Sequence, residues 1–399
     1  MKFSERINTH RFKKSNNNDN VFVLFLIIIM MIFSCFSIGT GNCPKLRFLP
    51  ELHFNLEPIR NLATQVFGDL YFLDDSSYIN PIFHRKKTTC NLCPTQTNST
   101  MSDSTDRDLA MGVLYGDHTY NVLTWVRNLR SVGCKATIVF FVTKEYMKVL
   151  TQLEIENLYN CGVFMFFFTQ FDPNKIRELR YAKNLIYPLF LNSYGQFFDR
   201  VLINDIYDSI FQKDPFLKTL NRNEIAVSIE RVRIKYHDWF QQRLRSMDPQ
   251  YSIEFYGSKF IINSGFFIGG SKTMLSLFSN ITDPQYMLKY DSNDQAILNM
   301  LYYRNIFPNL KVDLEGENYL SACYSVFEEN PDQDGFMHEI GYPHKLSVIH
   351  QYDRICHLVQ QISRVCPSLG QDHHYPSGRP NYIMQKCGSK TSVNNPPKD

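Results

Sequence analysis

Between residues 109 and 204 the sequence alternates short apolar runs with longer amphipathic segments. The apolar runs span 109–115, 136–142, 163–168 and 201–203. The segments between them repeat apolar side chains at helical spacing, at 120–129, 144–158 and 176–190. Strands that alternate with helices, joined by right-handed crossovers, build a parallel sheet with helices on both faces. The sequence therefore predicts an α/β fold with a doubly wound, mainly parallel sheet.

The pattern is looser after residue 216, but further elements can still be read. Helices are predicted at 231–245, 271–278 and 292–303. Residues 259–262 lead as a strand toward Gly269-Gly270, which predicts a turn before the next helix. An edge strand is expected at 311–313, and a late strand at 347–350 ends in a histidine. No internal repeat is present, so we expect one globular domain over 106–366.

The N-terminal region predicts a membrane anchor. Residues 21–38 carry no charged side chain, and as a helix they reach about 27 Å, near the hydrocarbon thickness of a bilayer. Basic residues dominate the preceding segment, which places the N-terminus in the cytoplasm and the rest in the lumen. A cleaved signal peptide is the alternative. We expect a cytoplasmic tail (1–20), a signal-anchor (21–39), a lumenal stem (40–105) and a polar C-terminal tail (367–399).

Cysteines and sequons agree with a lumenal location. All but one of the ten cysteines follow the apolar segment, and in an oxidising lumen most should pair, with at least one left free or intermolecular. Cys90 and Cys93 form a CxxC sequence, which we interpret as a structural disulfide in the stem rather than a zinc or redox site. Asn98 and Asn280 begin acceptable glycosylation sequons. The net charge of +3 is nearly balanced, so no nucleic-acid partner is expected.

Two carboxylates, Asp205 and Asp208, follow the apolar run at 201–203. Ligands of open α/β sheets bind outside the carboxyl ends of the strands. Neighbouring carboxylates repel each other unless a cation lies between them, and hard oxygen ligands suit Mg²⁺ or Mn²⁺. The spacing therefore predicts a divalent ion that binds the phosphates of a sugar nucleotide. An acidic turn after a buried strand is the alternative.

Five short motifs occur in a particular order along 107–355. They are Asp117 with Tyr120, Asp205 with Asp208, Asn263-Ser264-Gly265, Asp294-Gln295, and His350. Behind a type II anchor, this order resembles the metal-dependent, nucleotide-sugar glycosyltransferases of the GT-A fold, the type that includes glycogenin and the lipopolysaccharide galactosyltransferases. The resemblance implies a GT-A, Rossmann-like mixed sheet. One departure is the spacing Asp-x-x-Asp in place of Asp-x-Asp. Because of it, an inactive relative of these enzymes is the alternative interpretation.

The resemblance implies a role for each motif. Asp208 and His350 would bind Mn²⁺ or Mg²⁺, with Asp205 as a third ligand or a partner of the donor ribose. The nucleotide would contact Asp117 and Tyr120. The transferred sugar would contact the other predicted substrate-binding and catalytic residues, which are Asn263, Ser264, Gly265, Asp294 and Gln295. For Asp294 and Gln295 the alternative is a helix cap and first turn.

Two cations on the segment 176–190 complete the predicted site. Arg180 and Lys183 would offset the charge of the diphosphate, or else lie on a solvated helix face.

The predicted function is transfer of a hexose or pentose from a nucleotide sugar to a glycan, glycoprotein or glycolipid acceptor in the Golgi or the ER. One alternative is a non-catalytic GT-A relative that binds carbohydrate or a partner enzyme. Another is a phosphatase or phosphotransferase with Asp205 as nucleophile, but the lysine and further acidic residues of that chemistry are not recognisable, and it gives His350 no role.

Overall fold

The computed structural model describes residues 55–68, 90–94, 102–115, 122–148, 150–168, 172, 179–287 and 293–366. All of them belong to one compact unit, residues 55–399. None of the described helices combines the length and apolar composition that crossing a membrane requires. The expected anchor at 21–39 lies outside the described residues, as do both expected tails, Asn98, Asp117 and Tyr120.

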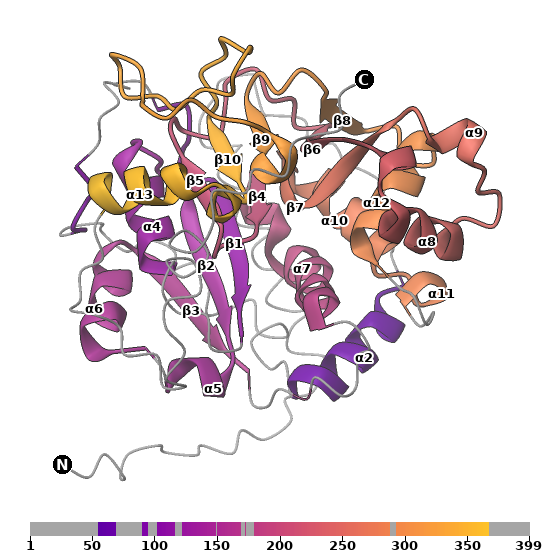
Figure 1. Ribbon diagram of the computed structural model, residues 1–399. Coiled ribbons are helices and arrows are strands. Elements are labelled where there is room, and N and C mark those ends of the chain that lie inside the picture. The colour runs from indigo at the N-terminus through magenta and orange to yellow at the C-terminus, as the bar shows by residue number, and fades with distance from the viewer. Residues whose placement is uncertain are drawn as a thin grey trace, which may run out of the picture. The chain divides into compact units, whose positions relative to one another are not determined.

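A mixed sheet of ten strands lies at the centre of the described residues (Figure 1). Its order is β3-β2-β1-β4-β7-β6-β9-β10-β5, and β8 pairs with β6. The first four strands in this order are mutually parallel, β7 runs antiparallel to both neighbours, and β5 runs antiparallel to β10. The strands are β1 (Asp108–Leu114), β2 (Thr137–Val142), β3 (Val163–Phe167), β4 (Arg200–Asn204), β5 (Ser209–Phe211), β6 (Ile225–Arg233), β7 (Phe260–Gly270), β8 (Leu310–Asp313), β9 (Tyr319–Ser321) and β10 (Val348–His350). The predicted α/β fold with a mainly parallel sheet is confirmed.

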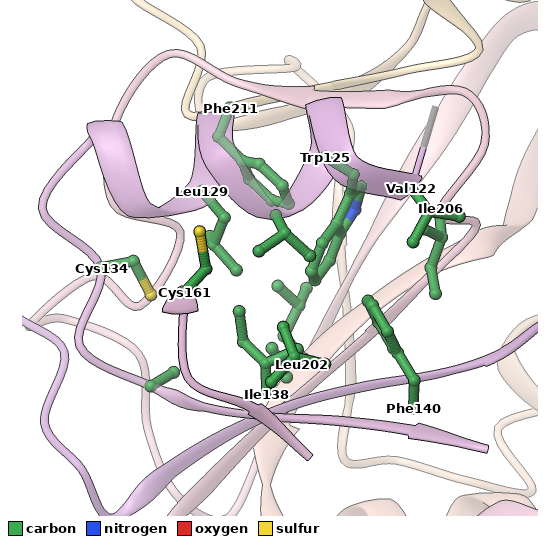
Figure 2. Packing of buried hydrophobic residues seen from close by; sticks show 14 of the residues in the cluster. Val122, Trp125, Leu129, Cys134, Ile138, Phe140, Cys161, Leu202, Ile206 and Phe211 are labelled. Carbon is green, nitrogen blue, oxygen red and sulfur yellow. The ribbon is translucent and has the colours of Figure 1, made fainter. Parts of the chain in front are cut away.

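Helices cover both faces of this sheet (Figure 1). On one face, Trp125 of α4 packs in one cluster with Ile138 and Phe140 of β2 (Figure 2). Leu158 of α6 belongs to the same cluster. On the other face, Phe141 meets Phe190 of α7 edge-on, 5.1 Å between ring centroids. Neighbouring residues of β2 thus point to opposite faces, as the period of a strand requires. The helices are α2 (Glu57–Phe67), α4 (Val122–Ser131), α5 (Lys144–Met147), α6 (Gln152–Asn160), α7 (Leu179–Tyr194), α8 (Asp238–Met247), α9 (Ile253–Tyr256), α10 (Ser271–Ile281), α11 (Pro284–Met287), α12 (Asp294–Tyr303) and α13 (Cys356–Val365).

Three predicted elements differ from the structure. The helix expected at 144–158 is two helices, because Thr151 begins α6 with a capping box in which its hydroxyl accepts from Glu154 N at 3.2 Å. The helix expected from residue 231 begins only at Asp238, since β6 continues to Arg233. Gly269-Gly270 ends β7 instead of forming a turn, and a Cβ on Gly270 would collide with the backbone of Arg222.

Segments before residue 106 contribute to the same compact unit as the sheet. In α2, Phe67 stacks on Phe168, with 4.2 Å between ring centroids. Asp214 accepts hydrogen bonds from Ser102 Oγ at 2.7 Å and from Ser104 N at 2.9 Å. These contacts attach the approach to β1 to the segment that follows β5.

The cysteine pairing differs from the expected CxxC disulfide, which is wrong. Cys90 is bonded to Cys161 at the start of the loop before β3, and Cys93 is bonded to Cys366 after α13. Both bridges therefore connect the segment 90–94 to distant elements. Among the described cysteines, Cys134 and Cys323 are free thiols, which agrees with the expectation that not all would pair.

Candidate metal centre

The two predicted carboxylates lie in the short turn between β4 and β5. Asp205 N donates a hydrogen bond to Gly265 O of β7 at 2.8 Å. Ile206, the next residue, is buried and points into the core beside Val122 (Figure 2). The turn is thus held by the core on one side and by β7 on the other. Asp205 and Asp208 remain partly exposed at the carboxyl edge of the sheet.

His350 ends β10 at the same edge, because β4 and β10 run in the same direction through the intervening strands. Its Nε2 lies 3.3 Å from Asp208 Oδ1 and 3.6 Å from Asp205 Oδ2. One ligand atom from each of the three residues lies within 4.8 Å of the other two. Gln351 follows in the left-handed conformation, with φ of 59°, and ends the strand at this point.

The chemistry of this cluster fits a divalent cation. Asp208 Oδ1 and both ring nitrogens of His350 are buried without a hydrogen-bond partner among the described residues. Buried polar atoms without a partner are rare and costly. A cation bound between them would satisfy Asp208 and Nε2 together. Carboxylates suit Mg²⁺ and Mn²⁺, and an imidazole suits transition metals.

The electrostatics of the cluster also favour positive charge. Burial by itself would lower the pKa of His350, but Asp208 and Asp205 outweigh it and raise the pKa to about 9. Without a metal, the imidazole therefore carries the positive charge that the carboxylates require. A bound cation would take over that role.

Gly265 leaves the room that the cluster needs. A Cβ at this position would collide with the His350 ring and would lie 2.9 Å from Asp205 Oδ2. The absent side chain thus lets the backbone of β7 lie directly against two of the three cluster residues. The expected contact of Gly265 with a substrate stays a prediction.

Lys183 of α7 reaches the cluster and forms an ion pair with Asp205 Oδ1. Burial opposes its charge, but the carboxylate outweighs burial and raises the pKa of Lys183 above its usual range. The same pairing, together with His350, lowers the pKa of Asp205 despite burial. Asp205 is thus already neutralised by a protein cation, which leaves Asp208 and His350 as the pair that would hold an ion. The side chain of Arg180 lies outside the described part of the chain.

Asp294 and Gln295 begin α12 beside this cluster. The N-cap of the helix is Asn293, whose Oδ1 accepts from Ala296 N at 2.9 Å, so Asp294 is not the capping residue. Asn184 Nδ2 donates to Asp294 Oδ2 at 2.9 Å. Burial raises the pKa of Asp294, an effect that Lys183 opposes. Gln295 Oε1 accepts from Ser264 N at 3.5 Å.

One acidic residue of the site escaped the sequence analysis. Glu230 of β6 is 6% exposed, and its Oε1 accepts hydrogen bonds from Asn263 Nδ2 and Gln295 Nε2. It therefore joins two motifs that are separate in the sequence. The signal that could have located it is the alternation of buried Ile225, Val227 and Ile229, which is typical of a strand.

The second predicted sequon lies at the end of α10. Asn280 Nδ2 donates to Ser276 O at 2.8 Å. Thr282 is fully buried and its hydroxyl donates to Phe278 O at 2.6 Å. Glycosylation of Asn280 stays a prediction, and it would have to precede folding of this helix end because the enzyme that adds the glycan must reach the threonine.

Among known proteins, solved structures resemble this chain whereas sequence families do not. No family model matches the chain, and no curated protein matches it. The crystal structure of mouse xyloside xylosyltransferase 1, in its apo form, is similar over 61% of this chain and 96% of that chain. The two share 16% sequence identity, and the TM-score is 0.35. Neither value is high enough to assign an activity to this chain.

Proposed function

We propose that this protein is a metal-dependent glycosyltransferase of the GT-A type, which transfers a hexose or pentose from a nucleotide sugar to a glycan, glycoprotein or glycolipid. The observation that carries the proposal is the contact between Asp208 and His350. Asp208 Oδ1 and His350 Nε2 are both buried and have no hydrogen-bond partner among the described residues. They lie 3.3 Å apart at the carboxyl edge of the sheet. Ligands of α/β sheets bind at this edge.

The ion would be held by Asp208 and His350, and when bound it supplies Lewis-acid stabilisation of the departing diphosphate. Lys183 holds Asp205 in place and keeps the net charge near the ion low. Asp294, Gln295 and Asn263 offer carboxylate and amide groups that orient sugar hydroxyls. Asp294 and Gln295 begin α12, Asn263 lies within β7 and Lys183 within α7, so the fold fixes the position of each backbone.

The location that we propose is the lumen of the Golgi or the ER, with residues 21–39 as a single type II anchor. Two disulfides between distant segments support an oxidising compartment. The uncharged segment 21–38 and the basic residues before it support the anchor and its orientation. Mn²⁺ is the proposed ion because it is a transition metal that carboxylate ligands suit, and the set combines carboxylates with an imidazole.

Calorimetric titration of the full chain in detergent micelles tests this proposal. The titrants are nucleoside diphosphates and nucleotide sugars, each with Mn²⁺ and with EDTA. We expect one nucleotide to bind only with Mn²⁺, and binding to be lost in Asp208→Ala. Asp106→Ala removes an exposed carboxylate elsewhere and should bind like the parent chain.

Release of nucleoside diphosphate from the bound nucleotide sugar then tests turnover. Steady release that requires Mn²⁺ supports a transferase. A folded chain that binds a nucleotide sugar and never releases product would instead identify a non-catalytic relative. A folded chain that binds no member of the panel would overturn the proposed site.

A further inference from the structure

Glu230 connects three elements around the proposed sugar position. It lies in β6, and its Oε1 accepts from Asn263 Nδ2 of β7 at 2.9 Å. The same oxygen accepts from Gln295 Nε2 of α12 at 3.0 Å. Asn263 Oδ1 in turn accepts from Gly265 N at 2.7 Å. One carboxylate oxygen thus fixes the orientation of both amide side chains.

The second oxygen of Glu230 has no such duty. Oε2 makes no hydrogen bond to any described residue. It is also not one of the fully buried polar atoms without a partner, so it is accessible to solvent. No lysine, arginine or histidine of the described chain forms an ion pair with Glu230. The side chain is 6% exposed. Glu230 is thus a buried carboxylate without a counter-ion, with one oxygen held and the other open.

The architecture does not require this negative charge. Burial of a carboxylate is unfavourable unless it is paired with a cation. A glutamine at position 230 could accept the same two hydrogen bonds through its amide oxygen, with no charge to desolvate. The charge therefore lowers the stability of the fold, and its benefit has to come from something that binds at the open oxygen.

The sheet register places Glu230 across from the metal pair. Glu230 is level with Ser321 of β9, and Ser321 is level with His350 of β10. Two strand spacings separate the positions of Glu230 and His350, or about 10 Å along the sheet. In glycosidases the two carboxyl groups that flank the glycosidic bond lie up to about 9.5 Å apart, so side chains from strand positions about 10 Å apart can reach both sides of one sugar ring. One sugar ring attached to a metal-bound diphosphate can fill such a gap.

We infer that Glu230 is a catalytic residue of the transfer, an inference that rests on the proposed function. As the bond between the anomeric carbon and the diphosphate oxygen breaks, its electron pair leaves with the diphosphate and positive charge develops on the sugar. The acceptor oxygen forms the new bond and releases its proton to solvent. Glu230 stays ionised and exchanges no atom, and its Oε2 stabilises the positive sugar while Oε1 holds the two amides.

Two variants separate the charge of Glu230 from its hydrogen bonds. Glu230→Gln keeps an oxygen for Asn263 and Gln295 but removes the charge, whereas Glu230→Ala removes both. The exposed Glu254→Gln is the matched control. In the full chain we measure Mn²⁺-dependent binding of nucleoside diphosphate, thermal unfolding, and product release from the nucleotide sugar that the parent chain uses.

We expect Glu230→Gln to unfold at a temperature equal to or above that of the parent chain, because the unpaired buried charge is gone. It should bind nucleoside diphosphate like the parent chain, with KM unchanged. Its kcat should fall by about 10²- to 10³-fold, the loss seen when one group that stabilises transition-state charge is removed. Glu230→Ala should lose kcat to a similar extent and also unfold more easily.

Turnover of Glu230→Gln within about threefold of the parent would overturn the inference and leave Glu230 a positioning residue only, while the proposed function stands. If the parent chain itself releases no product from any donor, the proposed function fails and the inference fails with it. Parent activity combined with loss in Glu230→Gln supports both.

Discussion

Gly112 of β1 and Ile206 are in direct contact, and the Ile206 side chain occupies the space that a Cβ on residue 112 would take. Cγ1 of Ile206 would lie 2.9 Å from that Cβ, and Cδ1 nearer still. Ile206 stands between Asp205 and Asp208, so the glycine receives the aliphatic side chain of the acidic turn. The packing of the core thus fixes where the two carboxylates lie, which no local sequence rule states.

Gly112→Ala should therefore disturb the metal centre from the core side of the turn that carries Asp205 and Asp208. The added methyl pushes Ile206 outward, which should lower the free energy of unfolding by about 1–3 kcal/mol, as overpacking does. Mn²⁺ affinity should fall as well. Adding Ile206→Val removes Cδ1, and in a double-mutant cycle it should recover part of both losses. Strictly additive losses in urea unfolding and Mn²⁺ titration would show that the contact does not position the turn.

Gly265→Ala tests the other side of the same centre. The new methyl meets the His350 ring and Asp205 Oδ2, so we expect Mn²⁺ affinity to fall by about 10- to 100-fold, the range for residues that support metal ligands. Ser258→Ala, at an exposed position before β7, is the control and should titrate normally. Isothermal titration with Mn²⁺ measures both. Unchanged affinity in Gly265→Ala would place the ion away from His350.

The fold and the metal centre were predictable to different depths. The alternation over 109–204 predicts β1 to β4 because strand and helix periods are local properties of the chain. Asp205 and Asp208 were predicted as a metal site from their position after the apolar run at 201–203, and His350 was added from motif order. The structure brings the three residues together. The ion pair between Lys183 and Asp205 was not predictable, since it depends on how α7 packs beside the end of β4.

Glu230 and the disulfides show why the remainder could not be predicted. The alternation over 225–229 is typical of a strand, but residues 230–233 are rich in charge, and pairing with β7 extends β6 as far as Arg233. Cys90 and Cys93 are close in sequence but bond to residues 71 and 273 positions away, respectively. Tertiary contacts override local propensity in both cases.

Arg130 should be essential for stability although it lies outside the site. Its buried guanidinium donates to the carbonyl oxygens of Cys161, Cys134 and Ala136 at 2.7–3.0 Å. A lysine cannot reproduce this geometry, so Arg130→Lys should lower the free energy of unfolding by about 2–4 kcal/mol. Arg107→Lys, at a side chain that is 57% exposed, should change it little. Equal urea midpoints for the two variants would contradict this account.

Asp248 should make stability depend on acid. Burial opposes its charge, but hydrogen bonds from Tyr256, Arg304 and Gln250 outweigh burial and lower its pKa. Because the folded pKa lies below the ordinary value of about 3.9, the stabilisation is complete above that pH and is lost as pH falls through the folded pKa. Asp248→Asn should thus destabilise by about 1.5–3 kcal/mol at pH 7.

The difference in free energy of unfolding between Asp248→Asn and the parent chain should decrease steadily when urea unfolding is measured at pH values from 5 down toward 2.5. Asp106→Asn, at an exposed carboxylate, should show no such convergence. A difference in free energy of unfolding that stays constant with pH would mean that the negative charge of Asp248 does not stabilise the fold.

The disulfide connectivity predicts the pattern of cross-linked peptides. Digestion without reductant should yield one peptide pair that joins Cys90 to Cys161 and another that joins Cys93 to Cys366. Mass spectrometry that finds Cys90 bonded to Cys93 would contradict the structure.

Each bridge should also stabilise the fold, but unequally, because the loops that they close span 71 and 273 residues. In the chain-entropy model the longer loop is worth about 1 kcal/mol more.

Paired alanine variants measure that difference. Cys93→Ala with Cys366→Ala opens the longer loop, and Cys90→Ala with Cys161→Ala opens the shorter one. Cys161 and Cys366 are both buried, with exposed fractions of 0% and 2%. The loss of packing is therefore similar for these two cysteines, and the comparison mainly reports loop closure. We expect the 93–366 pair to unfold at the lower urea concentration. The reverse order would mean that the unfolded chain retains structure near Cys366, so that the longer bridge restrains less than its length implies.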